Sequence, residues 1–103
     1  MDYIKEIENR SVISFGEINC ETPPEVAAEI RQEMVGFLRR NSRSKKKLEL
    51  EFGGKSRMSS DFADELFKDN RFKKYPNQVV VRQMHLFDRA MVPDDLKQTF
   101  VEE

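Results

Sequence analysis

The clearest strand signal in this 103-residue chain is the alternating run Leu48-Glu49-Leu50-Glu51-Phe52, which ends at Gly53-Gly54. Successive side chains of a strand point to opposite faces, so the run predicts two leucines and Phe52 on the core face of a sheet and both glutamates on the other. We therefore expect a strand over residues 48–52. We also expect an exposed Glu49, at which a change to lysine has a mild effect.

A helix and a second strand follow this run. Ser59, Ser60 and Asp61 are candidate helix caps, and a helix is predicted from residue 61 to about 68. Its buried stripe would be Phe62, Ala63, Leu66 and Phe67. The valines at 79–81 predict a buried strand within residues 78–84. The spacing allows a crossover between parallel strands, so residues 48–84 predict a β-α-β unit.

The N-terminal part predicts a hairpin and a long helix. Residues 3–7 and 11–15 are rich in apolar and β-branched side chains and flank polar residues 8–10, which is typical of paired strands. Thr22-Pro23-Pro24-Glu25 has the pattern of a capping box, with Thr22 as the cap. Apolar residues then recur at helical spacing to about Arg40, so this helix should pack on the sheet.

The C-terminal part carries weaker signals. Pro93-Asp94-Asp95 is typical of a helix start, whereas residues 85–90 fit either a helix or a loop. Together the elements predict an α/β fold with a mixed sheet, made of an N-terminal hairpin and a parallel β-α-β unit, and with helices packed mainly on one face. The length predicts a single domain over residues 1–103.

Composition excludes several classes of protein. The chain is 36% charged and 38% hydrophobic with a net charge of −1, which gives no global attraction to nucleic acid or anionic membrane. No apolar run is long enough to span a bilayer, so we expect a cytoplasmic protein. The single cysteine, Cys20, rules out an internal disulfide and is expected to be a small buried hydrophobe. A monomer and a homodimer are equally compatible with the sequence.

The residues that could act as catalytic nucleophiles, bases or metal ligands have no evident partners in the sequence. Candidate nucleophiles are Ser59, Ser60 and Cys20, and a structural or surface role explains the sole histidine, His85, better than a catalytic one. Acidic pairs fit helix starts and the chain end rather than a metal site. The turn Gly53-Gly54-Lys55-Ser56 lacks the first glycine of a phosphate-binding loop. We therefore predict no enzyme, no cofactor and no metal.

One segment departs from the balanced charge. Its basic residues, with no acid among them, are Arg39, Arg40, Arg43, Lys45, Lys46 and Lys47. Such cations can neutralise phosphates, but interleaved aromatics are absent and a solvated loop also explains the pattern. Nucleic-acid binding through residues 39–47, as a phage or defence accessory protein, is the alternative function. Contact with an acidic protein surface is a further reading of the same charge.

The order of elements and the segment 58–67, Met-Ser-Ser-Asp-Phe-Ala-Asp-Glu-Leu-Phe, resemble the STAS domain of sulphate transporters and anti-sigma factor antagonists. The resemblance covers roughly residues 10–85. It is closest to prokaryotic STAS-like domains of unknown function, whose hallmark is a hydrophobic residue, two or three serines and then Phe-Ala-Asp-Glu-Leu-Phe. It implies a prokaryotic or phage origin and a protein partner such as a histidine-kinase-like ATPase or a defence component.

The resemblance also raises the question of a phosphosite. In anti-sigma factor antagonists the corresponding turn is Asp-Ser-Ser-Gly, and a partner kinase phosphorylates its second serine to switch binding off. Direct alignment puts this position on Asp61, a fixed carboxylate, and a shift of one residue puts it on Ser60. A serine at a helix start suits a phosphate, but capping alone also explains Ser60.

The turn at 56–62 follows a parallel strand, at the edge where open α/β sheets place their working surface. The expected patch consists of Arg57, Met58, Ser59, Ser60 and Asp61, with the turn Glu17 to Asn19 beside it. A small exposed patch suits a protein partner better than a substrate. The sequence thus predicts a non-enzymatic regulatory module that binds its partner through this turn.

Overall fold

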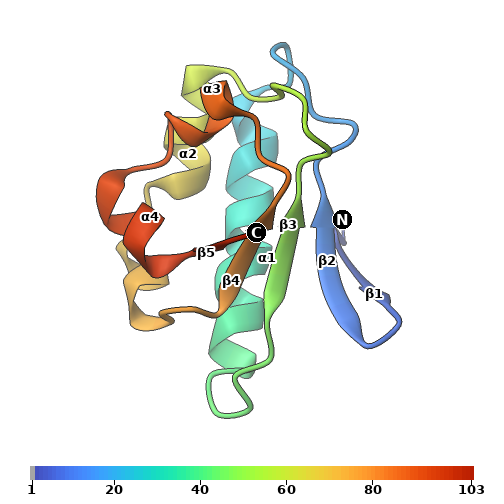
Figure 1. Ribbon diagram of the computed structural model, residues 1–103, viewed down its shortest axis with the longest axis vertical. Coiled ribbons are helices and arrows are strands. Elements are labelled where there is room, and N and C mark those ends of the chain that lie inside the picture. Colours follow the sequence, from blue (N-terminus) through green and yellow to red (C-terminus); the bar gives the residue numbers. More distant parts are fainter. Residues whose placement is uncertain (1) are drawn as a thin grey trace.

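The structure is a computed structural model that describes residues 2–103. The chain forms a sheet with helices packed against it (Figure 1). The strands are β1 (Ile4–Ile7), β2 (Arg10–Ser14), β3 (Leu48–Glu51), β4 (Val79–Arg82) and β5 (Val101–Glu102). The helices are α1 (Pro24–Arg40), α2 (Ser60–Phe67), α3 (Leu86–Arg89) and α4 (Asp94–Thr99), with a 3-10 helix η1 (Asn70–Lys74) before β4. This arrangement confirms the predicted α/β class.

The strands lie side by side in the order β1-β2-β3-β4-β5. β1 and β2 are antiparallel and form the predicted hairpin, whereas every later pair is parallel. Glu8 and Asn9 at the hairpin turn have φ of 50° and 68°, the conformation that a two-residue loop of this kind requires. Leu50 of β3 lies in register between Ile13 of β2 and Val81 of β4. The parallel β3-β4 pair confirms the β-α-β unit.

The core lies between the sheet and the helices α1 and α2. Leu48, Leu50 and Phe52 are fully buried, as the alternation predicts. The rings of Phe15 and Phe52 stack with centroids 4.3 Å apart, which joins the ends of β2 and β3. The predicted stripe of α2 is also buried: Phe62, Ala63, Leu66 and Phe67. Among residues 2–103, no helix has the length and apolar content needed to cross a bilayer.

The predicted capping box of α1 is wrong. Pro23 is the N-cap and Pro24 the first helical residue, and no side chain caps the first amides. The hydroxyl of Thr22 turns back into the preceding turn, where it accepts a hydrogen bond from the N–H of Asn19 at 2.9 Å. The helix still runs to Arg40 as expected. It buries most of the predicted apolar face: Ile30, Met34, Phe37 and Leu38.

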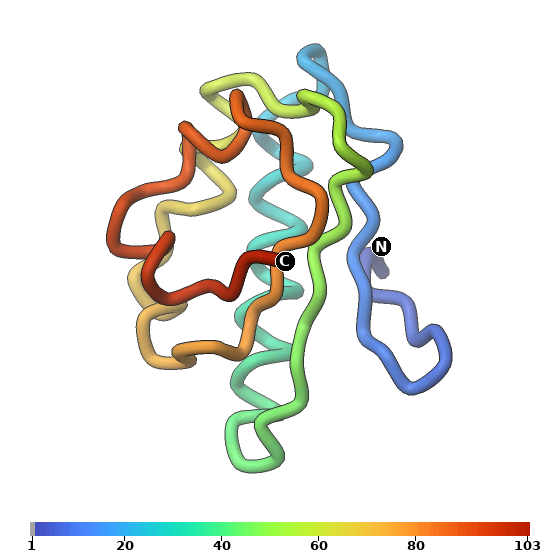
Figure 2. Tube along the Cα trace, viewed as in Figure 1, coloured from blue at the N-terminus to red at the C-terminus, as the bar shows by residue number. Residues whose placement is uncertain are grey.

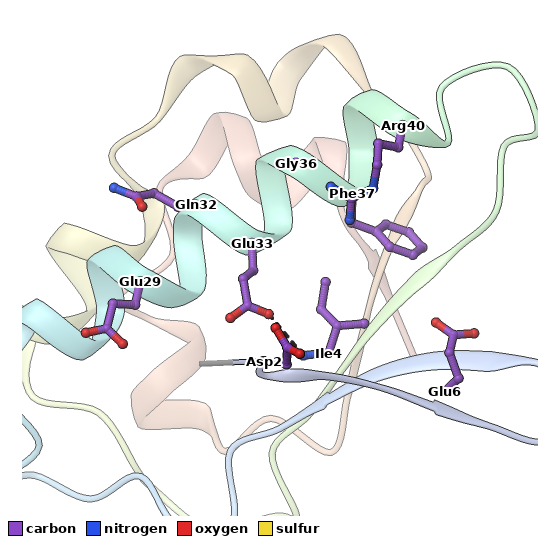
Figure 3. Close-up of a pocket in the computed structure, with 9 residues that line it drawn as sticks. All are labelled: Asp2, Ile4, Glu6, Glu29, Gln32, Glu33, Gly36, Phe37 and Arg40. Carbon is purple, nitrogen blue, oxygen red and sulfur yellow. Dashed lines mark hydrogen bonds between the residues drawn. The ribbon is translucent and has the colours of Figure 1, made fainter.

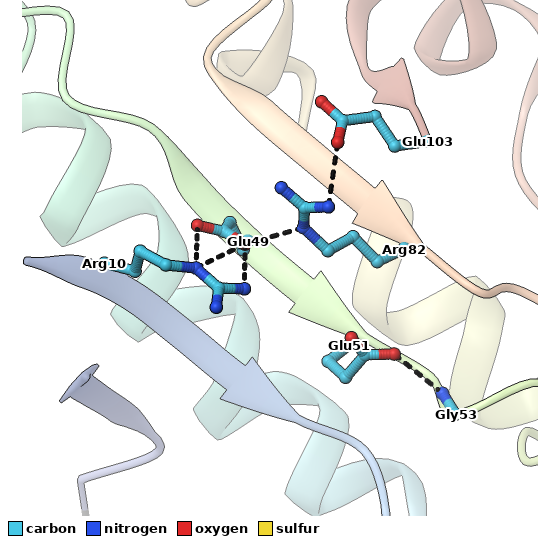
Figure 4. A network of polar contacts seen from close by, with 6 residues as sticks. All are labelled: Arg10, Glu49, Glu51, Gly53, Arg82 and Glu103. Carbon is cyan, nitrogen blue, oxygen red and sulfur yellow. Dashed lines mark hydrogen bonds and ion pairs between the residues drawn. The ribbon is translucent and has the colours of Figure 1, made fainter. Parts of the chain in front are cut away.

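The predicted exposure of Glu49 is also wrong. This residue is only 7% exposed, because arginines from both neighbouring strands lie over it (Figure 4). Arg10 Nη2 donates to Glu49 Oε1 at 2.6 Å, and Arg82 Nε donates to the same oxygen at 2.7 Å. Arg82 also pairs with Glu103 at 2.8 Å. The hydrogen bond from Arg10 is the largest cause that lowers the pKa of Glu49, so the carboxylate is charged at neutral pH.

The C-terminal residues form short elements that the sequence only partly predicts. α4 is the helix expected after Pro93, and α3 occupies the segment that fits a helix or a loop. β5 adds Val101 and Glu102 to β4, and a strand of two residues has no periodicity that a sequence could reveal. Phe72 of η1 packs edge to face on Phe100, with centroids 5.8 Å apart.

Cys20 lies in the turn between β2 and α1 and is exposed. The expectation of a buried small hydrophobe is therefore wrong. The side chain that this turn sends into the core is that of Ile18, which is 8% exposed.

Candidate protein-binding site

The turn after β3 begins at a glycine pair. Gly53 and Gly54 have φ of +71° and +79°, where glycine alone avoids steric cost, and they reverse the chain directly after Phe52. The turn lies beside the end of β2 (Figure 2). Arg57 Nη1 donates to the carbonyl of Gly16 at 3.3 Å, and its Nε donates to that of Phe52 at 3.4 Å. Arg57 thus joins the turn after β3 to the start of the turn at Glu17 to Asn19, which the sequence places beside it.

The serines at the start of α2 differ in role. Ser59 is the N-cap, and its Oγ accepts a hydrogen bond from the N–H of Phe62 at 3.1 Å. Ser60 and Asp61 are exposed in the first turn of the helix. Met58 is 5% exposed and belongs to the hydrophobic core, so it cannot form part of the exposed patch expected for it.

Asp88 of α3 holds this turn in place. It is fully buried, and its carboxylate accepts a hydrogen bond from Ser56 Oγ at 3.2 Å. It also accepts from the backbone N–H groups of Arg57 and Met58, at 2.8 and 3.3 Å. These donors offset the free energy that burial of a carboxylate costs. The sequence does not reveal this role of Asp88, because its partners lie 30 to 32 residues earlier in the chain.

Two large apolar side chains lie exposed on α3. Leu86 is 71% and Phe87 is 69% exposed, and both belong to the helix that Asp88 fastens to the turn. His85 caps this helix, since its Nδ1 accepts a hydrogen bond from the N–H of Phe87 at 3.1 Å. This is a structural role of the kind that the sequence favoured for the histidine. Exposed apolar side chains rimmed by polar ones are typical of interaction surfaces.

The hydroxyls of the turn serve structure or face solvent. Ser56 donates to Asp88, Ser59 caps α2, and Ser60 is exposed. Within residues 2–103, no group of three or more His, Cys, Asp or Glu side chains is placed to hold a metal ion. The site therefore presents hydroxyl, carboxylate and guanidinium groups to a ligand, beside the apolar side chains of Leu86 and Phe87.

Asp88→Asn should loosen the turn without unfolding the protein. The amide keeps one acceptor oxygen for three donors and brings its own N–H groups against the backbone N–H of Arg57, which costs about 1–3 kcal/mol. We expect faster amide exchange at Arg57 and Met58, measured by NMR. Asp94→Asn, at a carboxylate that is 98% exposed, is the matched control. Unchanged exchange in Asp88→Asn would contradict this role.

The basic segment lies at the opposite end of β3 from this turn (Figure 1). Arg39 and Arg40 end α1, and Arg43 and Lys45 lie in the following loop. All four side chains are exposed, and none of them takes part in an ion pair within residues 2–103. The segment is therefore a separate surface from the turn and α3.

The other two lysines of the segment have structural partners. Lys46 pairs with Glu6 at 2.8 Å, and Lys47 Nζ donates to the carbonyl of Asn77 at 2.6 Å. Gln78 is buried beneath the loop, and its Nε2 donates to the carbonyl of Lys46 at 3.0 Å. Part of the basic charge thus fastens the loop to the sheet.

Comparisons of the chain with protein-family models, with curated proteins and with solved structures find no match. The resemblance to STAS domains rests on residues 58–67 and on the order of the elements.

Proposed function

We propose that this chain is a non-enzymatic, STAS-like regulatory module that binds a protein partner through the turn 56–62 and α3. The observation that carries the proposal is the exposure of Leu86 and Phe87 on a helix that the buried Asp88 fastens to the turn. The binding surface, named here the turn-α3 surface, consists of Arg57, Ser60, Asp61, Leu86 and Phe87.

The composition of the turn-α3 surface supports a protein as the partner. Complete burial of a leucine or phenylalanine side chain contributes about 1.5–3 kcal/mol, so Leu86 and Phe87 can supply the centre of an interface. Polar and charged groups occupy the rim of such interfaces, and Arg57, Ser60 and Asp61 fit that position. A small substrate would need a deep cavity instead.

Charge at the start of α2 would tune the affinity. Asp61 carries a fixed negative charge in the first helical turn, where the helix dipole favours it. The cap belongs to Ser59, so phosphorylation of Ser60 would add charge to the surface and leave the cap intact. The resemblance to anti-sigma factor antagonists makes a histidine-kinase-like ATPase the first partner to test.

Phe87→Lys should abolish capture of the partner from an extract of the native host and leave the melting temperature nearly unchanged. The side chain is 69% exposed, so the substitution removes a central contact at little cost to the fold. With the purified partner, we expect binding to weaken by at least about tenfold, as for a central interface residue. Affinity capture with mass spectrometry, followed by calorimetric titration, measures both effects.

Ile7→Lys is the matched control, because it makes the same change at an apolar side chain that is 50% exposed on the hairpin. Asp61→Lys reports on the charged rim. A partner retained by wild type and by Ile7→Lys, but lost from Phe87→Lys, supports the proposal. Equal retention by all variants would overturn it.

The four exposed cations of the basic segment favour a second function, the binding of nucleic acid. The same capture experiment distinguishes it. Nuclease treatment should then release the retained material, and the double variant Arg43→Glu, Lys45→Glu should no longer retain it. Retention should also fall steeply with salt, while Phe87→Lys should have no effect.

A further inference from the structure

A groove of about 650 Å³ lies between β1 and α1 (Figure 3). Its acidic lining residues are Asp2, Glu6, Glu29 and Glu33, and among the described residues that line it the only basic one is Arg40. Lys46 pairs with Glu6 from outside this lining, so the negative charge of the groove comes mainly from Asp2, Glu29 and Glu33. Burial raises the pKa of Tyr3, and the neighbouring carboxylates of Glu29 and Glu33 raise it further. The groove therefore carries a negative field that favours a cationic ligand.

The groove follows an open edge of the sheet. β1 is the outermost strand, and the N–H groups of Tyr3 and Ile4 donate away from the sheet to Glu33 Oε1, at 2.8 and 3.2 Å. Backbone groups of alternate residues in an antiparallel strand point to the same side. The N–H and C=O of Glu6 therefore also point away from β2. Glu33 already accepts from the N–H of Ile4, so the part of this edge that is open to a further strand is at Glu6.

A glycine widens the groove on its helical wall. Gly36 stands within the 17-residue helix α1, where glycine costs about 1 kcal/mol relative to alanine. A Cβ there would meet only Arg40 Nη1, at 3.1 Å, and this is the far end of a flexible side chain. Packing of the core therefore does not require glycine at this position. The missing side chain instead keeps space open between helix and strand.

From these three features we infer that the groove binds an extended basic segment of a partner protein, which adds a strand beside β1. The backbone of the segment would pair with Glu6. Side chains alternate along a strand, so lysine or arginine at every second position would reach Glu29 and Glu33. An acidic segment would be repelled. This site is separate from the turn-α3 surface and does not depend on the proposed function.

A second copy of this chain fits the same edge less well. A twofold axis normal to the sheet would pair β1 antiparallel with the β1 strand of a second copy. The registers that overlap most of both strands then place Lys5 opposite Lys5 of the other copy, or Glu6 opposite Glu6 of the other copy. Like charges directly opposite each other destabilise a strand pair. The charge of β1 thus favours a different, basic occupant.

The test uses the full chain and a fluorescent, blocked peptide that alternates valine with arginine, followed by fluorescence anisotropy. We expect a dissociation constant in the micromolar range that rises with salt. Glu29→Lys should weaken binding by at least about tenfold, and Gly36→Met, which fills the groove and improves helix propensity, should do the same. Glu25→Lys makes the same charge change at an exposed position of α1 outside the groove, and it should bind as wild type.

Amide exchange of Glu6, measured by NMR, tests the added strand itself. Its N–H should exchange at least about tenfold more slowly with peptide bound. No binding of the basic peptide at millimolar concentration and low salt would overturn the site, and binding without protection of Glu6 would overturn the added strand. Self-association that protects Glu6 without peptide would assign the edge to a second copy instead. Phe87→Lys should bind the peptide normally, which separates this test from that of the proposed function.

Discussion

Leu50→Asp is expected to abolish cooperative folding. Leu50 is fully buried in β3, with Ile13 and Val81 beside it on the neighbouring strands. The substitution removes an apolar side chain from the core and places a carboxylate there without a hydrogen-bond donor or a cation to pair with. The combined cost is about 5 kcal/mol or more, which equals the whole stability of many small domains. Circular dichroism during heating measures the loss.

Ile7→Asp gives the matched control for this substitution. Ile7 is, like Leu50, a large aliphatic residue of a strand, but it is 50% exposed at the end of β1. We expect the control to melt cooperatively, within a few degrees of wild type. A cooperative melt of Leu50→Asp at the wild-type temperature would show that β3 does not lie at the centre of the core.

Glu49→Lys is expected to destabilise the protein by about 3 kcal/mol, although Glu49 occupies the polar side of β3. The new cation would lie between Arg10 and Arg82, whose guanidinium groups now bond to one carboxylate. The side chain at position 49 is only 9% exposed, so the new cation would be poorly hydrated beside two guanidinium groups that are themselves 47% and 34% exposed. Chemical denaturation measures the change in the free energy of unfolding.

Glu51→Lys changes the same charge two residues further along the same face. Glu51 is half-buried, and its carboxylate accepts one hydrogen bond, from the N–H of Gly53 at 3.1 Å. We expect a loss below about 1 kcal/mol there. Equal losses in the two lysine variants would mean that the arginines on either side of Glu49 add nothing to stability.

The contribution of Glu49 should also depend on pH. The hydrogen bond from Arg10 is the largest influence on its pKa, burial opposes it, and Arg82 adds to the lowering below the ordinary 4.5. A lowered pKa stabilises the folded state above the unfolded value, and this stabilisation is lost as the pH falls through the folded value. The deficit of Glu49→Gln relative to wild type should therefore be largest at neutral pH and shrink below about pH 4.5.

The local sequence pattern was sufficient to predict the strands and helices whose burial follows from their own periodicity and caps. The alternation of residues 48–52 identified the buried leucines, and the Ser59 cap with its apolar stripe identified α2. The same alternation could not reveal that Glu49 is covered. That burial depends on Arg10 and Arg82, which lie 39 and 33 residues away in the chain.

The candidate site divides in the same way. The sequence located the turn with Ser60 and Asp61, because glycines and caps are local signals. It did not identify Leu86, Phe87 or Asp88. A four-residue helix has too few turns to show amphipathic periodicity, and the bonds of Asp88 to the turn form only in the folded protein.

The order of the strands in the sheet has a consequence for how the protein is made. Each strand lies next to the one synthesised just before it, so no strand must insert between two that are already paired. Chains emerge from the ribosome with the N-terminal end first, and this sheet can grow by addition at a single side. Val101 and Glu102 add the last strand of this sheet, so the flank of β4 stays open to other nascent chains until these two residues have left the ribosome.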